Sequence, residues 1–483
     1  MTSHVSTFTV GRRPRAASRT REAMSWGMVF LTIYTMVAIG RIQEAFQELA
    51  ILHLGMVFGI MALTAWVAMP GSMADKVPMA VKPVKFVMLL LAISVVTVPI
   101  AVWPGGSFDY LTGSYIKTIL LFLMVYWLCR SLPDVRRIMW GACLALTVLV
   151  LTGVLSGSLA RPPEVVTPVN EYEVEKQWQF ASKTYDPNDL ALVLVMTMPL
   201  CLFLWSTAGK MGKGLIISMM LINLYGIVLT QSRGGFLALL VVGGLIMKRS
   251  MMSRSQKTAI VVLAVVVFGA LAGKAYWDRI ETIWNPQTEY DRTAGGRTDI
   301  WKTGVMLFVT HPWGVGLNGF NYAEGLSHGG KGKWSSPHNM FIQVAVELGL
   351  AGLIVFILLL KHSILQLRGI QRTVDVRAGP RKLGARIGRT AELPTVSFTG
   401  QGKDGDDTQQ VLLLAASLEI CLIGYAVGGF FLSLAYAGLP YAVLAMSLVT
   451  ARLAGNLKTP EAAPALKTGV RTLWPPAERR FGR

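Results

Sequence analysis

Residues 214–247, GLIISMMLINLYGIVLTQSRGGFLALLVVGGLIM, decide the fold of this chain. Two apolar runs flank the short polar segment QSRGG at 231–235, the first of them close to the roughly 18 to 20 residues that cross a bilayer as a helix and the second shorter. An apolar run crosses as a helix because every backbone hydrogen bond must be satisfied within the segment. The stretch therefore predicts two membrane helices with Arg233 between them.

The same pattern extends over most of the chain. Hydrophobic residues make up 53%, charged residues only 15%, and the mean hydropathy is +0.49, which is far from the balance of a soluble domain. About twelve apolar runs are long enough to count as membrane helices. They lie near 24–40, 49–69, 86–103, 116–131, 136–160, 188–206, 214–231, 234–247, 258–273, 339–361, 411–433 and 436–453. We predict an all-α polytopic membrane protein of about twelve transmembrane helices.

Basic residues explain the formal net charge of +19. They gather in alternate connections between the apolar runs, whereas the other connections are neutral or acidic, such as the glutamate-rich stretch 164–175. By the positive-inside rule, both termini are cytoplasmic and the long polar interval 274–338 lies outside. Because the basic excess follows topology, nucleic acid is not an expected partner.

These features divide the chain into six parts. They are a basic cytoplasmic N-terminus (1–23), a scaffold of membrane helices with an outer loop at 161–187 (24–187), the helices that carry QSRGG (188–273), a large outer catalytic loop (274–338), the C-terminal helices with a basic cytoplasmic loop at 362–410 (339–453), and a cytoplasmic tail (454–483).

Arg233 is the sharpest functional signal in the membrane region. An arginine at the centre of a membrane helix costs roughly 2.5 to 3.5 kcal/mol. One interpretation is an interfacial arginine that extends its side chain to the lipid headgroups. The other is an anion site, because Gly234 and Gly235 allow close backbone approach and the planar guanidinium binds phosphate oxygens in pairs.

The outer interval carries GGRTDIW at 295–301. We expect an amphipathic helix to begin near Arg297 and to lie on the membrane. A cation in the first turn of a helix is disfavoured by the helix dipole, so Arg297 indicates an external anionic partner. Arg292 adds positive charge nearby and serves either this partner or solvent.

Two further motifs follow. HPWGVGLNGF, from His311 to Phe320, has the proline and glycine content of a turn with unusual backbone angles, and a structural role is favoured. His338 stands at the start of the tenth apolar run, where it is either an interfacial residue or a general base that takes a proton near neutral pH. Glu347, inside that run, is a functional candidate or a helix-packing residue.

Asn188 or Asp189 is expected to cap the sixth helix, or to form a polar lip at the outer mouth of a lipid-lined cavity. Cys129, Cys143, Cys201 and Cys421 all lie in apolar runs, without zinc spacing or a disulfide framework. The sequence has neither a P-loop nor a dinucleotide-binding glycine motif. No metal or other cofactor is therefore expected.

QSRGGFLALL, GGRTDIW, HPWGVGLNGF and PHNMFIQVAVELGLAG, in this order, resemble the bacterial O-antigen ligase and polymerase superfamily over about residues 188–360. The resemblance implies a GT-C-like membrane glycosyltransferase of the bacterial inner membrane, active in lipopolysaccharide or exopolysaccharide biosynthesis. Such an enzyme moves a glycan from a polyprenyl (undecaprenyl) diphosphate carrier to an acceptor hydroxyl on the periplasmic face, without a metal or nucleotide sugar.

The resemblance also assigns roles to residues. Arg233 and Arg297 would hold the carrier diphosphate, and His338 would activate or orient the acceptor hydroxyl. We expect further substrate contacts from a second set of residues, Arg292, His311, Asn339 and Asn188. Membrane lipids complete the expected partners.

Three functions remain open at this point. A ligase would use lipid A core or a protein hydroxyl as acceptor, and this is our first expectation; a polymerase would use another carrier-linked glycan repeat. A secondary transporter is a more distant alternative. Transporters place their ion sites at mid-membrane between repeated halves, whereas the distinctive residues here gather at one surface and no internal repeat is evident.

Overall fold

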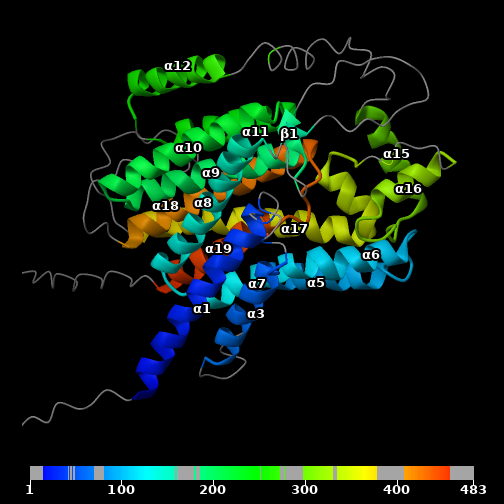
Figure 1. Cartoon of the computed structure of the whole chain (residues 1–483), viewed down its shortest axis with the longest axis horizontal. Helices are drawn as coiled ribbons and strands as arrows, with labels where there is room; N and C mark the ends of the chain where they lie inside the picture. The colour runs from blue at the N-terminus through cyan, green and yellow to red at the C-terminus, as the bar shows by residue number, and fades with distance from the viewer. Residues whose placement is uncertain are drawn as a thin grey trace, which may run out of the picture.

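A computed structural model of the chain gives the fold (Figure 1). It describes residues 15–41, 51–69, 81–157, 160–161, 179–180, 185–250, 252–271, 297–329, 336–377 and 407–456, together with Gln43, Phe46, Leu49, Trp277 and Trp334. Arg292, most of the predicted outer loop 161–187, the predicted basic loop beyond residue 377 and both ends of the chain lie outside the described residues.

Each predicted apolar run coincides with a helix. These helices are α1 (Arg15–Gly40), α3 (Leu54–Val67), α5 (Lys82–Thr97), α7 (Ile116–Leu128), α8 (Leu132–Ser156), α9 (Pro187–Thr207), α10 (Lys210–Leu229), α11 (Arg233–Arg249), α12 (Arg254–Leu271), α17 (Met340–Arg377), α18 (Asp407–Gly428) and α19 (Gly438–Asn456). By length and composition, 7 candidate spans in the described part of the chain are able to cross a membrane. The all-α membrane fold is confirmed, while the number of about twelve spans stays a prediction.

Shorter elements complete the described chain. They are α6 (Pro104–Tyr110), the π-helical turn η2 (Leu111–Tyr115), α15 (Arg297–Thr310), α16 (Phe320–Ser327), the 3-10 turn η3 (Gly429–Phe431) and a two-residue hairpin pair, β1 (Ala160–Arg161) with β2 (Gln179–Phe180). The predicted runs 86–103 and 116–131 are separate, as expected, but the second helical segment begins earlier than predicted. Pro104, which is well tolerated in a first helical turn, begins a helix that continues through η2 into α7.

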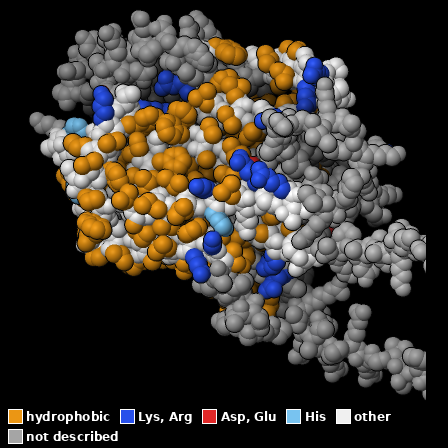
Figure 2. All heavy atoms as spheres, turned by 180° about the vertical axis from the view of Figure 1, so that it is seen from behind, with side chains coloured by type: hydrophobic (Ala, Val, Ile, Leu, Met, Phe, Trp, Pro, Cys, Tyr) orange, Lys and Arg blue, Asp and Glu red, His pale blue; other side chains and the backbone are white. Residues whose placement is uncertain are grey.

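The centre of the bundle is formed by helices that are apolar on every side. In the most apolar stretches of α9 and α18, 78% of the residues are buried, as expected for helices surrounded by other helices. The apolar residues of α12 instead include exposed Val262, Leu263 and Val265. Hydrophobic side chains also cover a broad face of the molecule in Figure 2, which fits a surface in contact with lipid tails.

Helix α17 is broken at Gly349, whose φ of 69° and ψ of −170° are not helical. The segment 312–316 fills the break. The N–H groups of Val315 and Gly316 donate to the carbonyls of Val346 (2.8 Å) and Glu347 (3.1 Å), and the N–H of Leu350 donates to the carbonyl of Pro312 (3.0 Å). The structural role predicted for HPWGVG is therefore confirmed, because it satisfies backbone groups that the break leaves open.

Helices α15, α16 and α6 gather at one end of the bundle, called here the α15 end (Figure 1). The predicted helix beginning at Arg297 is α15. Helix α15 packs on α17. Its Gly304 leaves room for Ile342 of α17, and its Leu307 is buried. Its outer side exposes Val305, Met306 and Val309, so the prediction that it lies on a membrane stays a prediction.

Candidate functional site

The starts of α9, α11, α15 and α17 meet at the α15 end. The Ser232 hydroxyl, just before α11, donates to the Asn188 side-chain oxygen at the start of α9 (2.8 Å). The Trp301 indole of α15 donates to the carbonyl of Pro337, just before α17 (2.8 Å). Because the first turn of a helix has unpaired N–H groups and the positive end of the helix dipole, this arrangement is suited to an anion.

Arg233 is the first residue of α11. Ser232 caps the helix by accepting a hydrogen bond from the N–H of Gly235 (3.0 Å). Gly235 packs against Ala191 of α9, so a larger residue would collide there. Arg233 therefore lies at the first position of α11 rather than in its middle, at the point where α9 and α11 touch.

His338 is held in a left-handed backbone conformation, with φ of 44°. The residues on both sides are fixed. Pro337 accepts the bond from Trp301, and the Asn339 side-chain oxygen accepts from the N–H groups of Phe341 (2.9 Å) and Ile342 (3.1 Å), which makes Asn339 the cap of α17. Asn339 is buried and its oxygen is occupied by this cap, whereas a substrate contact was predicted for it.

The charges around His338 set its protonation. Its Nδ1 lies 4.0 Å from Asp186 Oδ2. Burial lowers the pKa of His338 below its ordinary 6.5, the Asp186 carboxylate raises it, and the Arg297 guanidinium lowers it again, with a net decrease. The imidazole is therefore neutral near pH 7 and can accept a proton. The effect of Arg297 also shows that its charge lies close to the imidazole.

The prediction that Asn188 or Asp189 caps α9 is wrong. Asp186 is the cap, because its Oδ1 accepts from the N–H of Asp189 at 2.7 Å. Pro187 occupies the first position of the helix, where its missing N–H costs nothing, and so the cap falls one residue earlier. Asn188 instead joins α9 to α11 through Ser232.

Sequence reasoning missed Asp186 and Arg41. The Tyr185 hydroxyl donates to the carbonyl of Ile39 (3.1 Å), which ties the end of α1 to the residue before Asp186. Arg41 follows directly, with a left-handed φ of 49° and a buried Nε that has no hydrogen-bond partner among the described residues. YDPND contained a signal for Asp186, but nothing near Arg41 distinguishes it from an ordinary interfacial arginine.

A comparison with known protein families identifies the region that carries this site. Residues 218–357, less than a third of the 483-residue chain, match the family described as O-antigen ligase. This region of the chain is similar to the O-antigen ligase family. No curated protein matches it. The match confirms the predicted resemblance and supports membrane glycan processing of the ligase or polymerase type.

The ligase-family region contains Arg233, Arg297 and His338, and the structure brings all of them to the α15 end. His311 does not join them. It follows α15, at the end opposite Arg297 and about 20 Å away at 1.5 Å per residue. There its ring lies 2.9 Å from the exposed hydroxyl of Thr310. Arg292 lies outside the described residues.

Glu347 lies next to the break in α17 and is buried. The polar groups around it include the N–H groups of Asn318 and Phe320 and the side chains of Gln343 and Tyr436. Glu347 therefore connects the ligase-family loop to the membrane helices, which favours the packing interpretation. In the described part of the chain, no group of three or more His, Cys, Asp or Glu residues is arranged to hold a metal ion.

At the opposite end, a carboxylate is fully surrounded. Glu419 of α18 is 0% exposed and forms ion pairs with Arg249 of α11 (2.8 Å) and Arg368 of α17 (2.7 Å). The amide of Gln371 donates to its other oxygen (2.7 Å). This network joins three helices and leaves the carboxylate no room to bind an ion.

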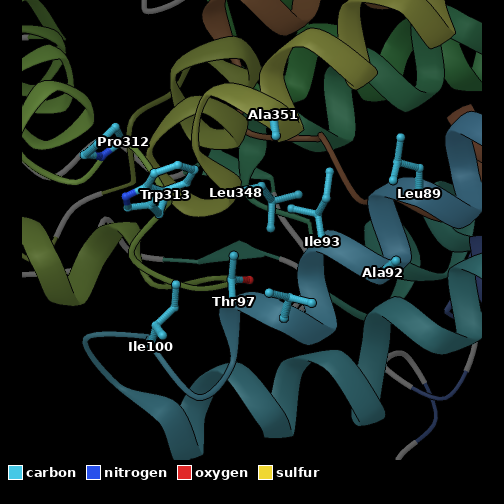
Figure 3. Close-up of a pocket in the computed structure, with 10 residues that line it drawn as sticks. Leu89, Ala92, Ile93, Thr97, Ile100, Pro312, Trp313, Leu348 and Ala351 are labelled. Carbon is cyan, nitrogen blue, oxygen red and sulfur yellow. The ribbon is translucent and has the colours of Figure 1, made fainter.

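An apolar groove of about 360 Å³ lies between α5 and the broken part of α17. Figure 3 shows Leu89, Ile93 and Ile100 on one side and Leu348 on the other, with Pro312 and Trp313 at one end. Thr97 is the only lining residue with a polar side-chain atom other than the Trp313 ring nitrogen. The charged residues of the site do not line the groove, so it is separate from the proposed chemistry.

Proposed function

We propose that this protein transfers a glycan from a polyprenyl-diphosphate carrier to an acceptor hydroxyl, with the α15 end on the periplasmic face of the bacterial inner membrane. One observation carries the proposal: a half-buried, neutral imidazole lies beside Asp186 and near the positive charge of Arg297, at the meeting point of several helix starts. A base for a hydroxyl and a cationic place for a leaving diphosphate are thereby close together.

The reaction needs both parts. The acceptor oxygen forms a bond to the anomeric carbon, and the bond from that carbon to the diphosphate oxygen breaks, with its electron pair leaving on the diphosphate. Negative charge on the diphosphate therefore grows toward the transition state, where Arg233 and Arg297 stabilise it more than in the bound donor. The acceptor proton moves to His338 and then to the diphosphate or to water.

Guanidinium groups suit this role because they stay charged at physiological pH and bind phosphate oxygens in pairs. In our proposal, they supply the positive charge that a divalent metal supplies in many other transferases. The driving force comes from the donor diphosphate bond itself, so the reaction needs neither ATP nor another cofactor. The acceptor we favour is lipid A core or a protein hydroxyl, as for a ligase.

The surroundings of Glu419 argue against a transporter. A coupling carboxylate must exchange its ion or proton during each cycle, and such groups line a cavity. Glu419 is instead held by two arginines and a glutamine. Glu419 is therefore unsuited to that role, and Glu347 is enclosed by the loop that fills the break in α17.

Reconstitution in vesicles tests the proposal. Purified protein would receive a synthetic polyprenyl-diphosphate glycan with lipid A core, with a protein acceptor, or with no added acceptor. We expect one glycan to be joined to an added acceptor. A ladder of longer carrier-linked glycans without an added acceptor would show a polymerase. Movement of glycan across the vesicle membrane without a new glycosidic bond would contradict enzyme function.

A further inference from the structure

Asp186 has one carboxylate oxygen in use and one facing His338. Its Oδ1 caps α9 by accepting from the N–H of Asp189 (2.7 Å), and its Oδ2 lies 4.0 Å from Nδ1 of His338. The Asp186 backbone is extended, with φ of −65° and ψ of 168°, a conformation favoured by the proline that follows. The cap therefore fixes the carboxylate and directs its second oxygen at the imidazole.

The imidazole side of this pair is equally constrained. Nδ1 of His338 is buried and has no hydrogen-bond partner among the described residues. Such an atom costs free energy unless a ligand, a water or a reaction step completes its hydrogen bonding. The left-handed backbone at His338 is also uncommon for a residue other than glycine. It persists because Trp301 holds Pro337 and Asn339 caps α17. These contacts point Nδ1 toward Asp186, so Nε2 is the ring nitrogen that does not face the carboxylate.

The remaining charges near His338 make the carboxylate necessary. Arg297 of α15 lowers the pKa of the imidazole and Asp186 raises it, and these two groups are the charges that act on it. The helix starts beside them add partial positive charge. An imidazolium formed during the reaction would therefore meet repulsion from Arg297, and among the described residues the Asp186 carboxylate is its attractive partner.

We propose that Asp186 is the positioning residue of His338, holding a proton on Nδ1 so that Nε2 accepts the proton of the acceptor hydroxyl. This inference rests on the proposed glycan transfer. When the acceptor oxygen attacks, its proton moves to Nε2 and the Nδ1–H of the resulting imidazolium donates to Asp186 Oδ2. The proton stays on the imidazolium until it passes to the diphosphate or to water. Asp186 itself is not protonated.

The present 4.0 Å separation is longer than a hydrogen bond. It needs to shorten by about 1 Å to form one, and such tightening on substrate binding is common at sites of proton transfer. Because Asp186 stands before α9 and His338 before α17, a small approach of these two helix starts suffices. The pair is thus ready to close when the donor and acceptor occupy the site.

The test is Asp186→Asn in the full-length protein in vesicles. Asparagine keeps an oxygen for the cap of α9, so the fold is retained, while the charge is lost. We expect the transfer rate at saturating substrates to fall about 10- to 100-fold, which is part of the roughly 10²- to 10⁴-fold that a general base supplies. The KM for the donor should stay within about twofold, and the acid side of the pH profile should move to lower pH.

The matched control is Asp134→Asn. Asp134 closes the cap of α8 by accepting from the N–H of Ser131 (3.0 Å), so this change also removes a capping carboxylate. The carbonyl of Cys129, just before the α8 cap, is contacted by Arg452 near the end of α19. The cap of α8 therefore lies near the end of α19, away from its start and from the α15 end. The control should therefore keep the wild-type rate and pH profile, whatever it does to thermal stability.

A second measurement does not depend on transfer. The rate at which diethyl pyrocarbonate modifies His338, followed by mass spectrometry of its peptide, reports the fraction of neutral imidazole at each pH. We expect Asp186→Asn to lower the pKa of His338. A wild-type pKa in this variant, or a wild-type rate and pH profile, would overturn the inference. If wild-type protein transfers no glycan but the pKa shift is found, the proposed function fails while the pairing stands.

Discussion

The two ends of α11 place arginines in opposite situations. Arg249, in the last turn, is favoured by the helix dipole, is 4% exposed and pairs with buried Glu419. Arg233, in the first turn, is opposed by the same dipole, and it lies at the end where His338 and Asp189 have buried polar atoms without hydrogen-bond partners in the described structure. At one end a buried ion pair joins helices, and at the other the charges surround the candidate site.

This contrast separates structural charge from functional charge. A buried ion pair with complete hydrogen bonding joins helices and resists change, since removing one partner strands the other. A buried polar atom with no partner is tolerated only where a ligand, water or reaction completes it. Substitutions at these two classes of position should therefore give different kinds of defect.

The largest expected effect comes from His338→Ala. The rate of glycan transfer should fall roughly 10²- to 10⁴-fold because the general base is lost, while donor binding changes little. The assay is single-turnover transfer in vesicles together with donor binding. His311→Ala is the control, since His311 lies at the far end of α15 and should leave the rate unchanged. Equal losses in rate and binding would reassign His338 to binding.

Arg297→Ala should lower transfer about 10²- to 10³-fold without reducing the amount of folded protein, because one charge that stabilises the leaving diphosphate is lost. Transfer from the same vesicle preparation, normalised to protein detected by antibody, measures this. Lys302→Ala is the control: Lys302 follows on the same helix and pairs with Asp299 on the surface. A normal rate for the Arg297 variant would remove Arg297 from the site.

At the opposite end, Glu419→Ala should lower stability by about 3 to 5 kcal/mol, because Arg249 would be left buried without its carboxylate. Thermal unfolding in detergent would show a lower Tm, and the protein that remains folded should still transfer glycan. If the variant kept its Tm and lost transfer, the structural role assigned to this end would be contradicted.

Arg233→Lys and Arg249→Lys compare the two ends of α11 directly. Lysine keeps the charge but loses the paired geometry, so Arg233→Lys should lower transfer about 10-fold, near the tenfold-per-1.4 kcal/mol scale of one charged hydrogen bond. Arg249→Lys should instead lower the Tm and keep the rate. Full activity of Arg233→Lys would indicate simple charge anchoring.

The smallest effect concerns pH. A pKa of His338 below 6.5 means that the imidazole becomes protonated, and loses its ability to accept a proton, only at acidic pH. The rate should therefore be constant above that pKa and fall on its acid side. In Arg297→Gln, removing the positive charge should raise the pKa and move the acid limb to higher pH. A limb above pH 6.5 in wild-type protein would contradict the assignment.

The helices could be predicted because apolar runs of the right length have few alternatives in a membrane. The interruptions were harder to find. The helix break at Gly349 depends on residues 312–316, which lie far away in sequence, and no local pattern announces that contact. Pro104 looked like the end of a run, but it begins a helix, because proline is accepted in the first turn.

Candidate site residues could be named from the sequence only where a residue type carried its own chemistry. Arg233, Arg297 and His338 stood out because cations at helix starts and an imidazole at a membrane edge need an explanation. Asp186 was hidden by its neighbours, since a proline in first position moved the cap by one residue. Its approach to His338 arises from packing between helices that the sequence alone does not reveal.

The insertion of segment 312–316 into α17 has a consequence for how the protein is made. That segment leaves the ribosome before α17 does, so it is already synthesised when the helix emerges. Without it, two carbonyls and one N–H near Gly349 would lack hydrogen-bond partners in a buried, largely apolar region. Biogenesis of this helix is therefore a joint event, in which a soluble stretch completes the backbone of a membrane one.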